Sequence, residues 1–321
     1  MAQVTALGAE VAMAAPGEYH TCALKVDGTA WCWGRNWNGQ LGNDSTIGSL
    51  VPVQVKIDAD RLLTDVVWIS AGEAQNCAVT AAGAVLCWGM NLNGRLGDGT
   101  YFDRRVATPV SGLDAGWSQV RTARGHTCAL SDTGVLSCWG RNWSGQLGDD
   151  TYTERTTPVA VVWPVSPGPT VVTFACGDEF TCAVTAAGAA FCFGENGNGQ
   201  LGDDTTTDRR TPVQVNGHGA QVADVAAGAA HACLIRQDGG LWCWGNNYYG
   251  RLGDGTSTER RVPVAVTSYG EGVTDASCGR RSTCGVRDSR LSCWGYNYYG
   301  QLGDGTSTDR YTPQPVVYPG E

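Results

Sequence analysis

The chain has 321 residues, a formal net charge of −9 and a hydrophobic content of 42%. This composition is typical of a globular protein and excludes a disordered one. The acidic balance without clusters of lysine and arginine argues against a nucleic-acid-binding surface. No apolar run approaches the ~18 residues of a membrane span, and the first twenty residues lack the features of a signal peptide.

A single phrase recurs six times along the chain. It reads CWGRNWNGQLGND from Cys32, and its counterparts begin at Cys87, Cys138, Cys192, Cys243 and Cys293. Successive phrases start 55, 51, 54, 51 and 50 residues apart. This spacing predicts six repeats, with approximate bounds 4–55, 56–110, 111–162, 163–215, 216–266 and 267–318. A period of this length is typical of stacked repeats or propeller blades.

Each repeat predicts four short strands in the same order. In the first repeat they cover residues 11–17, 20–24, 29–34 and 51–55, and a glycine-rich loop precedes the fourth. Strands this short, separated by turn residues, are typical of a propeller blade. We therefore expect an all-β fold, a single β-propeller domain spanning 1–321 with six four-stranded blades. Because the repeats begin at a first strand and end at a fourth, we expect the two termini to meet and close the ring.

The stretch HTCALKVDGTAWCWGRNWNGQLG at 20–42 resembles the repeat of the regulator-of-chromosome-condensation (RCC1-like) propeller family. The shared pattern is H-T-x-A-L, a turn glycine, W-G-x-N-x-x-G-Q-L-G and a P-V strand. The resemblance is to a bacterial-type, cysteine-rich member of the family. The best-known members of the family have seven blades, so seven is the alternative to the six expected here.

Most of the repeated residues are expected to serve the fold. The glycines after the third strand suit tight turns, Asn36 can bond the backbone of its own loop, and Leu41 is expected to insert into the core. An aromatic residue recurs beside the second cysteine of each repeat and is expected to pack between blades: Trp33, Trp88, Trp139, Phe193, Trp244 and Trp294. The plant ultraviolet-B receptor, which resembles this family, has tryptophans in GWRHT-like phrases, whereas the nearest stretches here are GEYHT and RGHT. Photoreception is therefore not expected.

Acidic residues recur in the LGDGT loops, at Asp98, Asp149, Asp203, Asp254 and Asp304, and again about five residues later. Their oxygens could bind calcium, but the spacing lacks the twelve-residue pattern of an EF-hand. We expect them to cap turns and to pair with the arginine that follows. Neither a metal site nor a cofactor is expected.

Twelve of the 14 cysteines form pairs within repeats. The pairs are Cys22–Cys32, Cys77–Cys87, Cys128–Cys138, Cys182–Cys192, Cys233–Cys243 and Cys284–Cys293. Each pair flanks the turn between the second and third strands, where the two residues fall opposite each other within disulfide reach. We expect one disulfide per blade and hence an oxidising compartment, with buried thiols as the alternative. The last pair, one residue closer in sequence, is the least secure. Cys176 and Cys278 are left over; they could carry thiols or compete for a local pair.

Catalytic motifs are absent from the sequence. His20, His126 and His231 share one repeat position and are expected to belong to the scaffold, and His218 is expected to be solvated. No G-x-S-x-G, H-E-x-x-H or phosphate-loop motif occurs. We therefore expect a protein that is not an enzyme.

Recognition is expected in the positions that vary within the N-x-x-G loops. The candidate residues are Arg35, Trp37, Met90, Leu92, Arg141, Trp143, Tyr248, Tyr249, Tyr296, Tyr298 and Tyr299. These residue types are enriched at the centres of protein interfaces, although they could instead cover their own blade edges. We expect an exported propeller, extracellular, periplasmic or on the cell surface, that binds another protein or assembles with itself. The alternatives are a glycan-binding module and a cytoplasmic nucleotide-exchange factor for a small GTPase, which is the founding activity of the family.

Overall fold

The computed structural model describes residues 7, 8, 10–266 and 268–318. By its internal contacts the chain divides into two compact units. Unit 1 comprises Met1–Trp143 with Tyr152–Val161, and unit 2 comprises Ser144–Thr151 with Val162–Glu321. No α-helix occurs among the described residues, which include a 3₁₀ turn, η2 (Leu92–Gly94). That part of the chain thus offers no helix long and apolar enough to pass through a bilayer.

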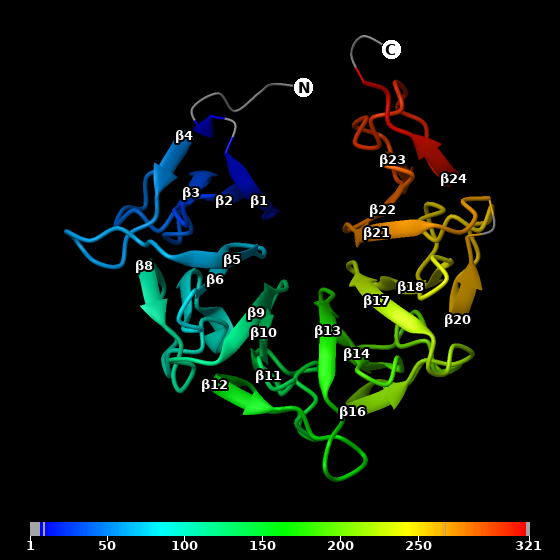
Figure 1. Cartoon of the computed structure of the whole chain (residues 1–321), viewed down its shortest axis with the longest axis horizontal. Helices are drawn as coiled ribbons and strands as arrows, with labels where there is room; N and C mark the ends of the chain where they lie inside the picture. The colour runs from blue at the N-terminus through cyan, green and yellow to red at the C-terminus, as the bar shows by residue number, and fades with distance from the viewer. Residues whose placement is uncertain (1–6, 9, 267, 319–321) are drawn as a thin grey trace. The chain divides into compact units, whose positions relative to one another are not determined.

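Unit 1 carries three four-stranded antiparallel sheets, blades 1 to 3 (Figure 1). Blade 1 contains β1 (Val11–Pro16), β2 (His20–Lys25), β3 (Ala30–Gly34) and β4 (Ser49–Gln54). Blade 2 contains β5 (Val66–Ala71), β6 (Gln75–Thr80), β7 (Val85–Gly89) and β8 (Arg104–Pro109). Blade 3 contains β9 (Trp117–Thr122), β10 (His126–Ser131), β11 (Leu136–Gly140) and β12 (Arg155–Ala160).

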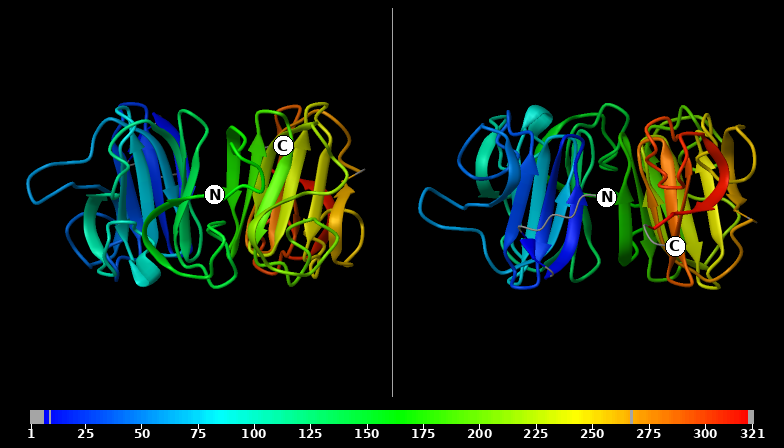
Figure 2. Two further views of the ribbon diagram at one scale, coloured as in Figure 1. Left: turned by 90° about the horizontal axis from the view of Figure 1, so that it is seen from below. Right: turned by 90° about the horizontal axis from the view of Figure 1, so that it is seen from above.

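Unit 2 carries blades 4 to 6, built in the same way. Blade 4 contains β13 (Val171–Cys176), β14 (Phe180–Thr185), β15 (Ala190–Gly194) and β16 (Arg209–Gln214). Blade 5 contains β17 (Val222–Ala227), β18 (His231–Arg236), β19 (Leu241–Gly245) and β20 (Arg260–Ala265). Blade 6 contains β21 (Val273–Cys278), β22 (Ser282–Arg287), β23 (Arg290–Gly295) and β24 (Arg310–Pro315). The prediction of a six-bladed β-propeller with four strands per blade is confirmed, and Figure 2 shows the blades from two further sides.

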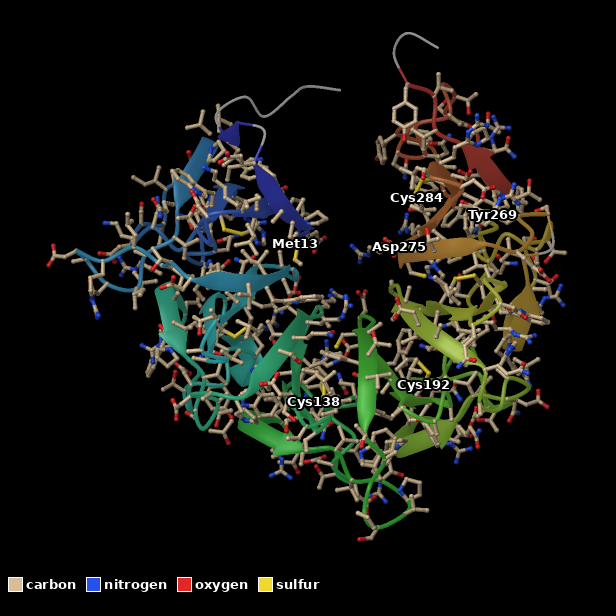
Figure 3. All side chains as sticks on the ribbon, in the orientation of Figure 1. Met13, Cys138, Cys192, Tyr269, Asp275 and Cys284 are labelled. Atoms are coloured by element: carbon tan, nitrogen blue, oxygen red, sulfur yellow. A yellow bond between two sulfur atoms is a disulfide. The ribbon has the colours of Figure 1, made fainter. Side chains whose placement is uncertain are left out.

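A disulfide joins the two central strands of every blade, as predicted. Cys22 and Cys32 are opposite each other in the β2–β3 register, with Cα atoms 4.1 Å apart. The same bond recurs in the other five blades, and Figure 3 labels three of them at Cys138, Cys192 and Cys284. The shorter spacing in blade 6 is accommodated because Asp288 and Ser289 both adopt positive φ in a two-residue turn. A turn of that kind matches the twist of a hairpin.

Neighbouring blades within a unit are joined by the repeated aromatic residue. The indole Nε1 of Trp88 donates to the carbonyl of Gln40 in the preceding blade at 3.1 Å, and that of Trp139 donates to the carbonyl of Arg95 at 3.0 Å. Gly97 lies so close to Trp139 that a Cβ would approach the indole nitrogen to 2.6 Å, and its φ is +72°. Trp33, the counterpart in blade 1, is only partly buried.

Candidate functional site

The N-x-x-G loops, which follow the third strand of each blade, are organised around a buried asparagine. In blade 5, Asn247 donates from Nδ2 to the carbonyls of Thr256 and Thr258, both at 3.1 Å. Its Oδ1 accepts from the backbone N–H of Leu252 at 3.0 Å. Asn91, Asn196 and Asn297 repeat this pattern in other blades. Since the asparagine is directed inward, the residues on either side of it are directed outward.

The recurrent aspartates of these loops are neutralised by arginine. In blade 6, Asp304 accepts hydrogen bonds from the Thr306 hydroxyl at 2.8 Å and from Arg310 Nε at 2.6 Å. Burial alone would raise the pKa of Asp304, but these hydrogen bonds outweigh burial and lower the pKa to about 2. The pairs Asp98–Arg104, Asp203–Arg209 and Asp254–Arg260 are equivalent. The predicted pairing is therefore present, and it occupies the oxygens that a calcium ion would need.

The histidines that share a repeat position belong to the scaffold. His20 Nε2 bonds Asn76 Oδ1 at 2.8 Å, and His231 Nε2 bonds the Thr283 hydroxyl at 2.9 Å, each across a blade boundary. Burial lowers the pKa values of His126 and His231 to about 3. The expectation for His218 is wrong: it is 6% exposed and packs edge-on against Trp242, with 4.6 Å between the ring centroids.

In unit 1 the candidate residues form two stacks of arginine on tryptophan. The guanidinium carbon of Arg35 lies 3.7 Å from the ring centroid of Trp37 and 5.3 Å from that of Tyr19. Arg141 covers Trp143 in the same way at 3.9 Å. Trp37 and Trp143 remain exposed, so the stacks present flat amphipathic surfaces to solvent. Such a stack orders an arginine without burying its charge.

Met90 and Leu92 are placed in the corresponding loop of blade 2. Leu92 is exposed and Met90 is half-buried. Neither residue is part of an aromatic or cation–π contact among the described residues. Met90 and Leu92 therefore occupy the same repeat positions as the stacked arginine and tryptophan residues, but they form no such stack.

In unit 2 the candidate tyrosines of blades 5 and 6 form one cluster. Ring centroids lie 4.7 Å apart for Tyr248–Tyr249 and for Tyr249–Tyr296, and 4.9 Å apart for Tyr298–Tyr299. Tyr248, Tyr298 and Tyr299 are 70%, 67% and 80% exposed. These five residues are among the eleven candidates named from the sequence, and the structure brings them together across the boundary between two blades.

Two arginines complete the tyrosine cluster and were missed in the sequence. The guanidinium carbon of Arg281 lies 5.5 Å from the ring centroids of both Tyr249 and Tyr296. Arg251 lies beneath Tyr249, at 5.7 Å from its ring. Both residues stand outside the N-x-x-G segment; no other repeat has arginine at the position of Arg281, and four repeats have glutamine at the position of Arg251. The variation used to select loop residues would also have found them.

Cys278 lies outside the six disulfides. Burial raises the pKa of its thiol to about 12, although hydrogen bonds to Thr283 and to the backbone of Cys233 act in the opposite direction. The thiol is therefore protonated at neutral pH. This protonation state makes it a poor nucleophile.

Comparison with known proteins agrees with this architecture. A family model described as "RCC1-like domain" matches residues 56–320, and models of the RCC1 repeat match residues 27–79 and 11–40. The ultraviolet-B receptor UVR8 of Arabidopsis thaliana is 37% identical over 223 residues, which cover 68% of this chain and 50% of the receptor. The human E3 ubiquitin-protein ligase HERC2 is 30% identical over 286 residues, 86% of this chain and 6% of the ligase.

Solved structures show the same fold. Human WBSCR16 superposes with a TM-score of 0.86 at 26% identity, covering 97% of this chain and 83% of that one. Prp20p from Saccharomyces cerevisiae superposes with a TM-score of 0.82 at 20% identity, covering 97% and 78%. The chain spans half or less of the length of the two curated relatives above. With one family model covering most of its length, the chain belongs to the RCC1-like family.

Proposed function

We propose that this chain is a non-enzymatic RCC1-like propeller that binds a protein partner through the exposed residues of its N-x-x-G loops. The observation that carries the proposal is the tyrosine cluster of unit 2, where Tyr248, Tyr298 and Tyr299 are all more than half exposed. Tyrosine provides a large, rigid contact area at low entropic cost and is enriched at interface hot spots. Exposed aromatic groups gathered in one place are typical of an interaction surface.

The absence of catalysis is part of the same proposal. His20, His126 and His231 are buried within the scaffold, and the recurrent aspartates described above are held by arginine. A general acid or base must reach its substrate, and these groups lack that access. Cofactors are not required for a binding function of this kind.

We further propose that the protein works in an oxidising compartment, outside the cytoplasm. Six disulfides, one per blade, support this assignment, because such bonds are rare where thiols are kept reduced. From the sequence we also propose that the protein is an assembly or surface subunit. We propose that it belongs to a bacterial-type subgroup of the family.

Two other functions compete with this proposal. Prp20p binds Gsp1p and histones. Nucleotide exchange on a small GTPase, or docking to chromatin, is therefore one alternative function for this chain. The net charge of −9 weighs against the chromatin role. Glycan binding is the second alternative, because exposed tyrosine and tryptophan rings can also stack on sugars.

A comparison of single variants tests the proposal. Wild-type protein, Tyr298→Ala and Trp37→Ala are immobilised and exposed to the extracellular fraction of the source organism, and bound proteins are identified by mass spectrometry. Tyr101→Ala is the matched control, since Tyr101 is 60% exposed but lies outside the N-x-x-G segments. We expect a partner that is retained by wild type and by the control, and is lost from at least one of the two test variants.

Two outcomes contradict the proposal. Equal retention by all four proteins, with unchanged melting temperatures, moves recognition elsewhere, most directly to the segments between blades at 56–65 and 161–171. Signals on a glycan array that disappear in Tyr298→Ala, without any protein partner, replace protein binding by glycan binding.

A further inference from the structure

Two buried arginines at the same repeat position have different surroundings. Arg95 in blade 2 and Arg251 in blade 5 occupy the position at which the other four repeats carry glutamine. Arg95 donates from Nη1 to Glu73 Oε2 at 3.2 Å and to the carbonyl of Arg124 at 2.7 Å, and from Nε to the carbonyl of Leu92 at 2.8 Å. In blade 2 the buried guanidinium is thus paired with a carboxylate.

Arg251 lacks that partner. Its Nη1 donates to the carbonyl of Arg280 at 3.2 Å, which corresponds to the Arg95–Arg124 bond. Its Nε is buried and has no hydrogen-bond partner within the described structure, although the residue is only 6% exposed. The repeat position of Glu73 is occupied in blade 5 by Ala229. A buried guanidinium without a carboxylate bonded to it is unfavourable, so blade 5 carries an arginine that an external carboxylate could satisfy.

A second arginine increases the positive charge at this point. Arg281 is exposed and lies against the rings of Tyr249 and Tyr296, and Arg251 contacts the same Tyr249 ring. Burial lowers the pKa of Arg251 to about 10, with a further contribution from the charge of Arg281, so Arg251 is charged at neutral pH. The acidic group that acts on Arg251 is Glu259, which accepts a hydrogen bond from Asn246 at 3.2 Å.

We propose that the tyrosine–arginine cluster of unit 2, formed by Tyr249, Arg251, Arg281, Tyr296 and Tyr299, binds a carboxylate side chain of an acidic peptide segment. This inference rests on the proposed protein-binding function and specifies the chemistry of the partner. The chain itself indicates which group fits, since Glu73 fills the equivalent position beside Arg95. The two guanidinium groups bind the carboxylate, and the tyrosine rings pack against its methylene groups and against an adjacent apolar residue.

The first experiment measures peptide binding by the full chain. The probe is the blocked peptide acetyl-Ala-Glu-Phe-Glu-Ala-amide, and its control replaces both glutamates by glutamine. We expect calorimetry to give a dissociation constant at least about tenfold lower for the glutamate peptide, with affinity falling as salt is raised. Equal binding of the two peptides overturns the proposal, as does inorganic phosphate binding as tightly as the glutamate peptide.

Two variants localise the site. Ala229→Glu supplies from within the chain the carboxylate that blade 2 has, so we expect it to abolish peptide binding and to raise the melting temperature. Arg251→Gln installs the residue found at this position in four other repeats, so we expect it to fold and to weaken peptide binding at least about tenfold. The matched control is Arg95→Gln in unit 1, which is expected to leave peptide binding unchanged.

The outcomes separate this inference from the broader proposal. If Ala229→Glu and Arg251→Gln both bind the glutamate peptide like wild type, the carboxylate site is refuted. If in the same series Tyr298→Ala still loses the natural partner, the loop surface keeps its protein-binding function and the partner is recognised by other groups. If neither the variants nor Tyr298→Ala changes any binding, both proposals fail together.

Discussion

Replacing Asn247 by alanine tests the reasoning about how the loops are held. The side chain is fully buried and fills two roles: Oδ1 accepts the Leu252 N–H at 3.0 Å, and Nδ2 donates to the carbonyls of Thr256 and Thr258. Alanine removes every one of these bonds.

The magnitude follows from the groups that lose their partners. A buried donor or acceptor left without a partner costs about 1 to 3 kcal/mol, whereas a typical satisfied bond contributes about 1 kcal/mol net. The Leu252 N–H is enclosed, and the two carbonyls lie nearer the loop surface, where water can partly replace the amide. We therefore expect Asn247→Ala to lower the free energy of unfolding by about 3 kcal/mol, a large fraction of the stability of a typical domain.

The assay combines urea unfolding with hydrogen exchange. Because repeat proteins can unfold in parts, exchange measured by mass spectrometry over residues 246–260 identifies which loop is affected. The control is Asn246→Ala, which removes the half-buried neighbour's bonds to Asn198, to Glu259 and from the Tyr248 N–H, but none of the bonds made by Asn247. If Asn247→Ala shifts the unfolding midpoint no more than Asn246→Ala and leaves exchange unchanged, the asparagine is not what holds the loop.

Further predictions concern pH, redox state and metals. Burial lowers the pKa of His231 from 6.5 to about 3. Below about pH 6.5 the unfolded chain therefore binds a proton at this histidine, whereas the folded chain does not. The free energy of unfolding should fall as the pH decreases from 6.5 towards 3. His231→Gln, the residue at the same position in blade 2, should flatten that pH dependence, and an unchanged slope would reject the assignment. Six disulfides should place the denatured, non-reduced mass about 12 Da below the reduced mass; a difference near zero in protein from its natural source would return it to a reducing compartment. Because Arg104 and its counterparts hold the recurrent aspartates, EDTA should leave the melting temperature unchanged, and a decrease reversed by calcium would show that the loops bind metal.

The features that the sequence predicted well are those repeated with fixed spacing. The strands and the six disulfides follow from one register. The turn between the second and third strands places Cys22 opposite Cys32 in the first repeat, and it places the equivalent cysteines opposite each other in the other repeats. The last disulfide was harder to predict, since its shorter spacing depends on two non-glycine residues, Asp288 and Ser289, adopting positive φ. That conformation is uncommon outside glycine and has no strong signal in a single sequence.

Features that depend on contacts between distant residues were predicted less well. His218 lies in a glycine-rich segment that reads as a solvated loop, yet it packs on Trp242 from the next hairpin. The tyrosines were among the candidates because they occupy variable positions of the N-x-x-G loops. Arg281 precedes the second strand of its blade and joins them only through the packing of blade 6 against blade 5. A one-dimensional pattern carries no information about that contact.

The repeats do record the difference at Arg251, once two positions are considered together. Each repeat has one residue equivalent to Glu73 and one equivalent to Arg95. In chain order these two residues are Glu18 and Gln40, Glu73 and Arg95, Arg124 and Gln146, Asp178 and Gln200, Ala229 and Arg251, and Arg280 and Gln301. An arginine at the second position is accompanied by glutamate in blade 2 and by alanine in blade 5. In blade 2 the two side chains bond each other and stabilise the fold. In blade 5 the charge is kept while its internal partner is absent, beside the largest group of exposed tyrosines in unit 2. A buried guanidinium without a carboxylate bonded to it is costly to retain, and binding of an acidic partner is a function that would account for it.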